Sequence, residues 1–265
     1  MRVAILAPIK SSLYSRLVTH LAASEPGIEV VCIVVRTVWS IRRFRSDLHR
    51  EGNRLLRKAY TRLVLSDEAA DWGSSELLHS MARELNVPGT SLTDLAADYN
   101  IPLVEVKDHN DKVSENVLRD SKPDVIAFTG GGLIRENILN IPTRGILNCH
   151  MGILPEYRGM DVVEWPVIEN RDGDPMLGLS LHFMDAGVDT GPILRQERIE
   201  LQPGDTSESI RARMVPFMVT LMLDGIRGLR DGSITPEPQS LEAGKQYYVM
   251  HPRMVKYSEQ RLSSR

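Results

Sequence analysis

Three polar residues carry side chains that could together transfer an acyl group and move a proton. Asn148 and His150 end the apolar run "GILNCH", and Asp189 lies in the later stretch "FMDAGVDTGPIL". An amide and an imidazole can donate hydrogen bonds to an oxygen that gains negative charge, while a carboxylate or an imidazole can move a proton. If the loops after the two strands lie side by side, these residue types predict an acyl-transfer site.

The spacing of the first two residues places them on one surface. Side chains of a strand alternate between faces, so Asn148 and His150 point to one side and Cys149 to the other. Either the pair only satisfies backbone groups at a strand end, or it forms part of a site. No G-x-S-x-G nucleophile elbow is present, which favours direct transfer over a covalent acyl-enzyme. Cys32 and Cys149 are expected to be small core residues.

The composition favours a small-molecule enzyme. The chain has 265 residues, of which 42% are hydrophobic, enough for a large core without disulfides. A net charge of -3 argues against nucleic acid as a partner over the whole surface. No run is apolar enough to cross a membrane or to act as a signal peptide, so a cytoplasmic protein is expected. The 7 histidines are scattered without ligand spacing, and no metal is expected.

Strand and helix patterns alternate along most of the chain, which predicts an α/β fold with a doubly wound, mainly parallel sheet. Short apolar runs bounded by turn residues predict strands, and amphipathic runs between them predict helices. The expected strands are 2–8, 28–37, 101–108, 123–132, 145–151 and 177–186, and the expected helices are 11–24, 113–121 and 161–170.

Two segments depart from this alternation. Residues 38–98 are longer than an ordinary connection and are expected to form a helical insertion in a catalytic domain of residues 1–205. Residues 206–265 are expected to add a C-terminal helix, capped by Asp205 or Thr206 and ending near Gly232, and then a short hairpin. The basic run from Arg36 to Arg62 is a solvated helix face, a clamp for the diphosphate of a substrate or a patch for tRNA phosphates.

The stretches "NCHMGILPEYRG" and "MDAGVDTGPIL" resemble the folate-dependent formyltransferases, the group of glycinamide ribonucleotide formyltransferase and methionyl-tRNA formyltransferase. The signature of that family is N-x-H, then S-L-L-P-x-Y-R-G, then an Asp before T-G or G-G. The resemblance covers residues 123–205 strongly, but Gly152 and Ile153 replace the usual Ser-Leu. It implies a Rossmann-like formyltransferase fold and transfer of a formyl group from 10-formyltetrahydrofolate to a primary amine.

The resemblance also implies a role for each polar residue. Asn148 and His150 would hold the oxyanion that forms when the amine attacks the formyl group, and Asp189 would act on the protons. A carboxylate beside His150 is expected to raise the pKa of the imidazole and favour its charged form.

By the same resemblance, other residues would contact the formyl donor or the acceptor. A glycine triplet lets a flat pterin ring approach the backbone closely, and apolar neighbours cover it. Residues at the start of the first helix could hold a phosphate or only cap the helix, and those of the Tyr-Arg-Gly motif could contact the acceptor or only fix the loop. The expected donor-binding residues are Gly130, Gly131, Gly132, Leu133, Ile134, Asp185, Gly187 and Val188. The expected acceptor-binding residues are Lys10, Ser11, Ser12, Tyr157, Arg158 and Gly159.

The acceptor is expected to be a small-molecule amine, with a nucleotide-linked amino sugar preferred. A tRNA acceptor is disfavoured because only about sixty residues follow Pro203, and glycinamide ribonucleotide because "APIKSSLYS" replaces its glycine-rich phosphate loop. Two alternatives stay open: a formyltetrahydrofolate deformylase, and a folate-binding protein without turnover. Both a monomer and a homodimer are compatible with the sequence.

Overall fold

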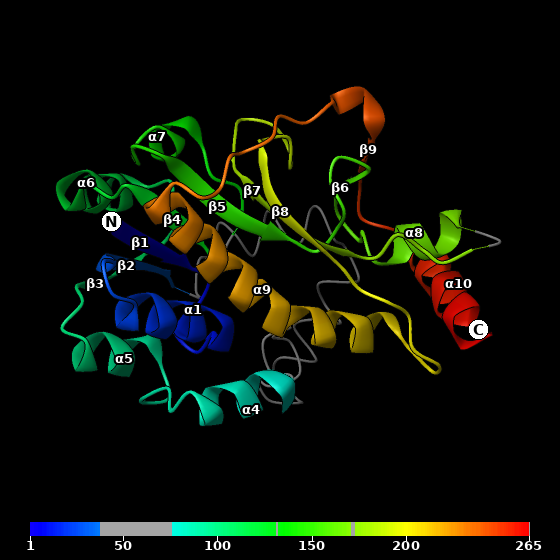
Figure 1. Ribbon diagram of the computed structural model, residues 1–265, viewed down its shortest axis with the longest axis horizontal. Helices are drawn as coiled ribbons and strands as arrows, with labels where there is room; N and C mark the ends of the chain where they lie inside the picture. Colours follow the sequence, from blue (N-terminus) through cyan, green and yellow to red (C-terminus); the bar gives the residue numbers. More distant parts are fainter. Residues whose placement is uncertain (38–75, 131, 171–172, 265) are drawn as a thin grey trace.

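The computed structural model describes residues 1–37, 76–130, 132–170 and 173–264. Within this part of the chain, a sheet of seven strands has the order β3-β2-β1-β4-β5-β7-β8. The five strands from β3 to β5 are parallel, while β7 and β8 run antiparallel to their neighbours (Figure 1). The expected α/β fold with a mainly parallel sheet is therefore confirmed.

The strands of this sheet follow the apolar runs of the sequence. They are β1 (Arg2–Ala7), β2 (Glu29–Arg36), β3 (Leu103–Val106), β4 (Val125–Phe128), β5 (Gly145–His150), β7 (Gly178–Phe183) and β8 (Ile193–Arg198). Two short strands, β6 (Tyr157–Gly159) and β9 (Lys245–Tyr247), pair in parallel outside the sheet. The strands from β1 to β5 and β7 all lie within the ranges expected from the sequence. Strand β8 was not expected, because only its first two residues are apolar and the four polar residues that follow are exposed.

Helices cover both faces of the sheet (Figure 1). They are α1 (Leu13–Ser24), α4 (Glu76–Glu84), α5 (Leu92–Asp98), α6 (Lys112–Ser121), α7 (Glu136–Leu139), α8 (Glu164–Glu169), α9 (Ser207–Asp231) and α10 (Pro252–Ser263), with a 3-10 turn at Leu241–Ala243. Helices α1, α4, α5 and α9 pack on one face, named here the α9 face, and α6 and α7 on the other, named the α6 face.

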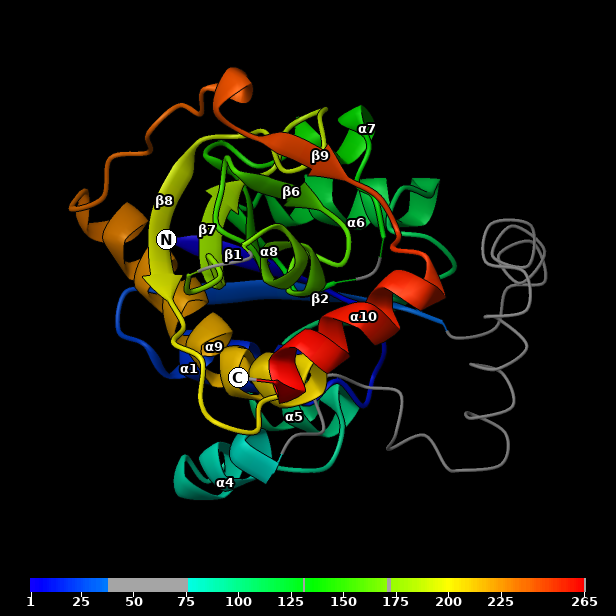
Figure 2. The ribbon, with the colours of Figure 1, turned by 90° about the vertical axis from the view of Figure 1, so that its right-hand side faces the viewer.

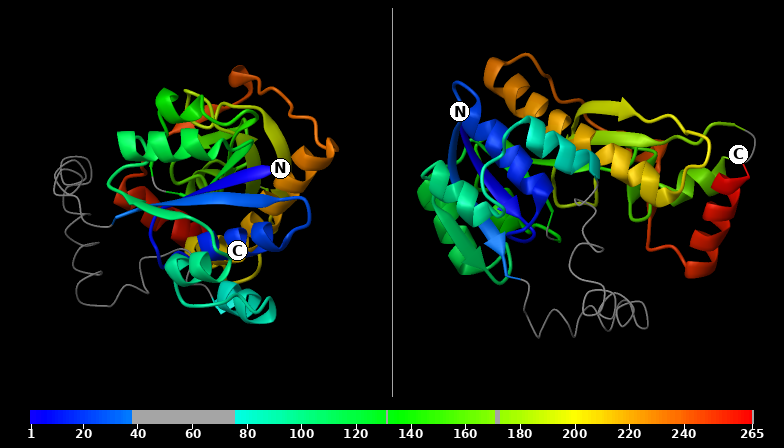
Figure 3. Two further views of the ribbon diagram at one scale, coloured as in Figure 1. Left: turned by 90° about the vertical axis from the view of Figure 1, so that its left-hand side faces the viewer. Right: turned by 90° about the horizontal axis from the view of Figure 1, so that it is seen from below.

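The longest helix, α9, begins and ends as the sequence predicts. The Thr206 hydroxyl accepts a hydrogen bond from the backbone of Ser209, and Gly232 ends the helix in the left-handed conformation. Helix α9 packs against β5 and β7, on the side of the sheet that faces the viewer when the molecule is seen from below (Figure 3). Gly225 allows this close approach, because a Cβ at that position would lie 2.2 Å from Leu181 on β7.

Two sequence expectations need correction or restriction. The expected C-terminal hairpin is wrong: β9 pairs with β6 instead, and the chain then forms α10, which packs beside α8 (Figure 2). His251 caps α10 and Pro252 begins it, a strong helix start. Of the expected insertion 38–98, residues 38–75 lie outside the described residues, and the rest forms α4 and α5, whose Leu78 and Leu92 join the main core.

Candidate active site

The polar end of β5 faces the α6 side of the sheet. Leu147 and Cys149 belong to the core on the α9 face, so strand alternation places Asn148 and His150 on the opposite face. Cys149 is buried, and burial raises the pKa of its thiol, so it is a core residue and no nucleophile. Asn148 is half-buried and His150 is 8% exposed. The common surface expected for the two side chains is therefore present.

A second histidine joins this surface from the neighbouring strand. His182 on β7 pairs directly with Asn148 on β5, and residues opposite each other in an antiparallel pair point to the same face. The Asn148 amide nitrogen lies 3.1 Å from Nε2 of His182. His182 is buried and touches the polar set, and the pairing of β5 with β7 places it there.

Asp189 reaches the site by a route that differs from the expected one. Because β7 runs antiparallel to β5, its last residue, Phe183, pairs with Leu147 rather than with the end of β5. The two loops therefore do not leave the sheet at the same edge. The loop after β7 instead returns toward His150, and the Asp189 carboxylate lies 3.5 Å from Nδ1 of His150 and 3.5 Å from Nε2 of His182.

Backbone contacts fix the position of Asp189. The amide N–H of Gly159 on β6 donates to Oδ2 of Asp189 at 3.0 Å. The Gln239 side chain donates to the carbonyl oxygens of Asp189 and Gly191. Asp189 itself has a φ of 53°, a left-handed conformation that is uncommon outside glycine and that Asp tolerates better than most residues. The contacts from Gly159 and Gln239 thus hold the loop so that the carboxylate lies between the two imidazoles.

Hydrogen bonds to carbonyl oxygens indicate which ring nitrogens carry protons. Nε2 of His150 lies 2.9 Å from the carbonyl oxygen of Tyr157, so Nε2 donates. Nδ1 of His182 lies 2.7 Å from the carbonyl oxygen of Phe183, so Nδ1 donates there and Nε2 accepts from the Asn148 amide. Neutral His150 therefore presents an unprotonated Nδ1 toward Asp189.

Burial and charge act in opposite directions on this pair. Burial lowers the pKa of His150 and outweighs the raising effect of the Asp189 charge. Burial alone would raise the pKa of Asp189, but the charge of His150, the close approach of His182 and the hydrogen bond from the Gly159 amide overcome it and lower that pKa to about 2. The expected rise in the pKa of His150 is therefore wrong, and the site holds an ionised carboxylate beside an imidazole that is neutral at neutral pH.

Gly152, where the sequence departs from the formyltransferase signature, packs directly against this histidine. A Cβ at Gly152 would lie 2.7 Å from Nε2 of His150 and 2.8 Å from the carbonyl oxygen of Tyr157. Contacts this short do not occur for real side chains, so a serine here would displace the hydrogen bond between those two groups. The glycine and the position of His150 belong together.

Comparison with known proteins shows the family of this chain. A family described as formyl transferase matches residues 1–225. The chain belongs to the formyl transferase family. Methionyl-tRNA formyltransferase of Thermodesulfovibrio yellowstonii is 30% identical over 161 residues, which are 60% of this chain and 51% of that protein. That of Deinococcus radiodurans is 31% identical over 163 residues, 60% of this chain and 49% of that protein. The chain spans about half the length of the curated relatives it matches.

Solved structures show the same fold at low sequence identity. Glycinamide ribonucleotide transformylase 1 from Symbiobacterium toebii has a TM-score of 0.58 at 15% identity, over 91% of this chain and 94% of that chain. WlaRD, a sugar 3N-formyl transferase crystallised with dTDP and 5-N-formyl-THF, has a TM-score of 0.61 at 13% identity, over 99% of this chain and 79% of that chain.

The residues expected to bind the donor lie in the loops after β4 and β7. Gly130 and Gly132 have φ values of 117° and 102°, which glycine adopts without strain. Leu133 is 71% exposed, whereas Ile134 is buried in the core of the α6 face, so only Leu133 is free to cover a ligand. Gly131 lies outside the described residues.

In the second loop, the Asp185 carboxylate organises the turn rather than pointing to the imidazoles. It accepts from the backbone of Gly187 at 3.0 Å and from the hydroxyl of Thr190 at 2.6 Å. A Cβ at Gly187 would lie 2.0 Å from that hydroxyl. Val188 is half-buried beside Asp189. These residues shape the loop that carries Asp189, and their contact with a donor stays a prediction.

Two of the three residues expected at a phosphate site have partners within the protein. Ser12 is buried and caps α1 by accepting from the backbone of Ser15. Lys10 forms an ion pair with Glu105 at 2.5 Å. Ser11 is exposed. Ser12 therefore fills the capping role that the sequence offered as the alternative, and acceptor binding by all three stays a prediction.

The Tyr-Arg-Gly motif forms β6 and holds the loop after His150. The Tyr157 ring stacks on Tyr247 of β9, with the ring centres 5.3 Å apart. Arg158 donates to the carbonyl oxygen of Gly244 at 3.2 Å. Gly159 supplies the amide that binds Asp189. Each member thus fixes the loop, while contact of Tyr157, Arg158 and Gly159 with an acceptor stays a prediction.

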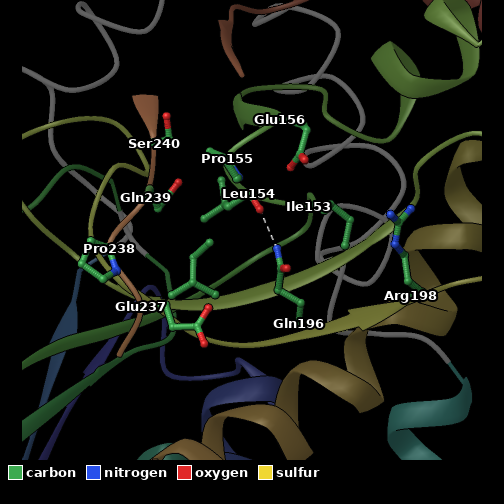
Figure 4. A pocket seen from close by; sticks show the side chains of 11 residues that line it. Ile153, Leu154, Pro155, Glu156, Gln196, Arg198, Glu237, Pro238, Gln239 and Ser240 are labelled. Atoms are coloured by element: carbon green, nitrogen blue, oxygen red, sulfur yellow. Dashed lines mark hydrogen bonds between the residues drawn. The ribbon is translucent and has the colours of Figure 1, made fainter. Parts of the chain in front are cut away.

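A pocket of about 490 Å³ lies next to this loop but not at the polar set. It is formed by the loop after β5, by β8 and by the segment before β9, and Gln196 donates to the carbonyl oxygen of Leu154 across it (Figure 4). Its lining residues are Ile153, Leu154, Pro155, Glu156, Ile193, Gln196, Arg198, Glu237, Pro238, Gln239 and Ser240. Gln239 links the pocket wall to the loop of Asp189.

Among the described residues, no three His, Cys, Asp or Glu side chains gather as a metal site would require. In the same part of the chain, no helix combines the length and the apolar character needed to span a bilayer. The basic run from Arg36 to Arg62 falls outside the described residues after Thr37, so its three interpretations stay untested.

Proposed function

We propose that this protein is an N-formyltransferase that moves the formyl group of 10-formyltetrahydrofolate to a primary amine of a small molecule. The observation that supports this most directly is the convergence of four side chains on one face of the sheet: Asn148 contacts His182, and Asp189 lies between His182 and His150. The set contains a donor for an oxyanion, a base and a carboxylate, and Cys149 is turned away from it.

Asn148 serves as the donor to the oxyanion. Its amide nitrogen carries two N–H groups, and one of them is directed to Nε2 of His182. That contact fixes the rotation of the amide, so the second N–H is free to donate to the formyl oxygen when the amine attacks the formyl carbon. A donor fixed in advance loses no orientational freedom during the reaction, and removing one such donor costs about 10²–10³ in rate.

His150 and Asp189 manage the proton of the attacking amine. The new C–N bond forms as the amine lone pair attacks, and the ammonium proton passes to the unprotonated Nδ1 of His150. The resulting imidazolium lies 3.5 Å from the Asp189 carboxylate, which stabilises it in a buried site. The bond from the formyl carbon to the folate nitrogen then breaks, and that nitrogen takes the proton. Tetrahydrofolate and the N-formyl product leave with the atoms balanced.

The residues around the polar set fit a folate donor. Gly130 follows Phe128, the strand partner of Asn148, by two residues and leaves the backbone there without a side chain, and the exposed Leu133 offers an apolar surface. A bound folate supplies the activated formyl group. The chain holds it against Asn148 and excludes water from the imidazoles.

For the acceptor, a nucleotide-linked amino sugar is the first candidate. A sugar 3N-formyl transferase shares the fold over nearly the whole chain, and no part of the polar set requires a macromolecule. Methionyl-tRNA is the competing candidate, because the relatives with about 30% identity carry that name. The two acceptors differ in size and are separated by experiment.

The test incubates the protein with 10-formyltetrahydrofolate and each of several amines: nucleotide-linked amino sugars, glycinamide ribonucleotide and methionyl-tRNA. Release of tetrahydrofolate and of formate is followed separately. We expect acceptor-dependent release of tetrahydrofolate without formate, with a loss of about 10²-fold or more in Asn148→Ala. Cys149→Ser, on the same strand but facing the core, serves as the control. Formate release without an acceptor would instead identify a deformylase, and folate binding without turnover a non-catalytic protein.

A further inference from the structure

Arg36, the last residue of β2, is a buried cation. The residue is only 4% exposed. Within the part of the chain that the structure describes, neither Nε nor Nη1 has a hydrogen-bond partner. Arg211, also buried, donates to both carboxylate oxygens of Glu164. A buried charge without a partner costs several kcal/mol, so proteins keep one where a ligand supplies the missing partner.

The strand register places Arg36 in line with the polar set. Paired positions run from Val34 on β2 through Leu6 and Phe128 to Asn148 on β5. Two residues farther along each strand, the same row contains Arg36, Pro8, Gly130 and His150. Strand alternation puts both end members of this row on the α6 face. Three strand spacings separate them, which corresponds to about 14 Å.

Small residues line the space between the two ends of this row. Gly130 has no side chain, and the nearest atoms to a Cβ built on it belong to Pro8, at 3.5 Å. No large side chain of Pro8 or Gly130 therefore separates the two ends of the row. A ligand whose reactive group lies at His150 can extend over Pro8 and Gly130 toward Arg36.

The carboxylate nearest along the sheet is not available to Arg36. Glu105 on β3 pairs with Val35 and therefore points to the α9 face, where it forms the ion pair with Lys10. Its neighbour Val106, which pairs with Arg36, belongs to the apolar core of the α6 face. Arg36 thus lies at the rim of an apolar core, with the acidic group of the adjoining strand on the other side of the sheet.

The loop after β4 leaves an atom-sized space beside the guanidinium. A Cβ built on Gly132 would lie 3.2 Å from Nη1 of Arg36, and apart from the glycine and its chain neighbours no other described atom lies within 4 Å of that position. That separation suits an oxygen that accepts a hydrogen bond from Nη1. The glycine thus leaves free the position that a ligand oxygen requires.

We infer that Arg36 binds an oxyanion of the substrate, a carboxylate or a phosphate, at the end of the site remote from the formyl group. A guanidinium accepts either anion through two parallel N–H donors. The anion comes from one of two sources, the glutamate carboxylates of the folate or the phosphate of a nucleotide-linked acceptor. The assignment of source rests on the proposed formyl transfer, whereas anion binding by Arg36 does not.

The test measures binding without turnover, by calorimetric titration with three probes: tetrahydrofolate, tetrahydropteroate, which lacks the glutamate, and inorganic pyrophosphate. The variants are Arg36→Met and Arg36→Lys, with Arg119→Gln on the exposed surface of α6 as the matched loss of one charge. If the anion is a glutamate carboxylate, Arg36→Met weakens binding of tetrahydrofolate but not of tetrahydropteroate. If it is a phosphate, Arg36→Met weakens binding of pyrophosphate alone. The expected loss is about 10- to 100-fold, with partial retention in Arg36→Lys.

The stability of the ligand-free variants separates binding from a structural role. Arg36→Met removes a buried charge, so the midpoint of its thermal unfolding should be equal to or above that of the wild type. A lower midpoint in both Arg36→Met and Arg36→Gln would overturn the inference, as would wild-type affinity of the folded variants for all three probes, or failure of the wild type to bind any of them. Anion binding without formyl transfer to any amine would leave it intact and refute only the proposed function.

Discussion

Asp189→Asn should remove a specific part of the acid dependence of stability. The carboxylate of Asp189 lies 3.5 Å from the imidazole of His150 and 3.5 Å from that of His182 and accepts from the Gly159 amide. Burial opposes ionisation, yet these contacts lower its pKa from 3.8 to about 2. A carboxyl with a lowered pKa stabilises the fold above its unfolded pKa and loses that contribution as the pH falls toward the folded value.

The size of this contribution follows from the shift. A change from 3.8 to about 2 corresponds to about 2 kcal/mol at neutral pH, at 1.36 kcal/mol for each pKa unit. Linkage predicts that about 1 kcal/mol of this is lost between about pH 5 and pH 3. The asparagine variant has no group to titrate at this position, so it should lack this loss.

Urea unfolding of both proteins, followed by far-ultraviolet circular dichroism at several pH values from 3 to 7, measures the effect. The other carboxyl groups titrate in both proteins and cancel in the difference between the two free energies. The difference should therefore narrow by about 1 kcal/mol from about pH 5 to pH 3. Parallel pH profiles would refute the conclusion that this carboxylate is held ionised between two imidazoles.

Three further outcomes are expected. Gly159→Ala places a Cβ 2.2 Å from the carbonyl oxygen of Tyr247 at a φ of 98°, so it should separate β6 from β9 and lower the unfolding free energy by about 1–3 kcal/mol in a urea titration. Glu164→Gln leaves the buried Arg211 without its anion and should cost about 3–5 kcal/mol; an unchanged urea midpoint would contradict this. The rate of formyl transfer should rise with pH along a limb below 6.5, because burial lowers the pKa of His150 and its neutral form is the base; a rate that falls as the pH rises through that range would exclude this role.

Strand alternation and residue type were sufficient to predict part of the site. The spacing of Asn148 and His150 alone places both on one face, since alternation is a local property of a strand. The contribution of His182 could not be predicted in the same way. Its place opposite Asn148 depends on which strand neighbours β5 and in which direction it runs, and this is a property of the whole sheet.

Energetic properties were the harder part to predict. A carboxylate beside His150 suggested a raised pKa, but the buried environment that lowers it comes from several segments that close over the ring. Likewise, the replacement of the usual serine by Gly152 indicated only a difference in the loop. Only the packing shows that a side chain there would meet His150. Long-range packing therefore decides features for which single-sequence patterns contain no information.

The close contact at Gly225 links the positions of β5 and β7 to helix α9 on the other face of the sheet. A methyl group at Gly225 would press on Leu181 of β7 and lie 3.6 Å from Leu147 of β5. Leu181 and Leu147 adjoin His182 and Asn148 in sequence, and a displaced strand carries both of its faces with it. One added carbon on α9 would therefore change the separation of an amide and an imidazole that it never touches. The separation of Asn148 and His182 is therefore partly set by a helix on the opposite face of the sheet.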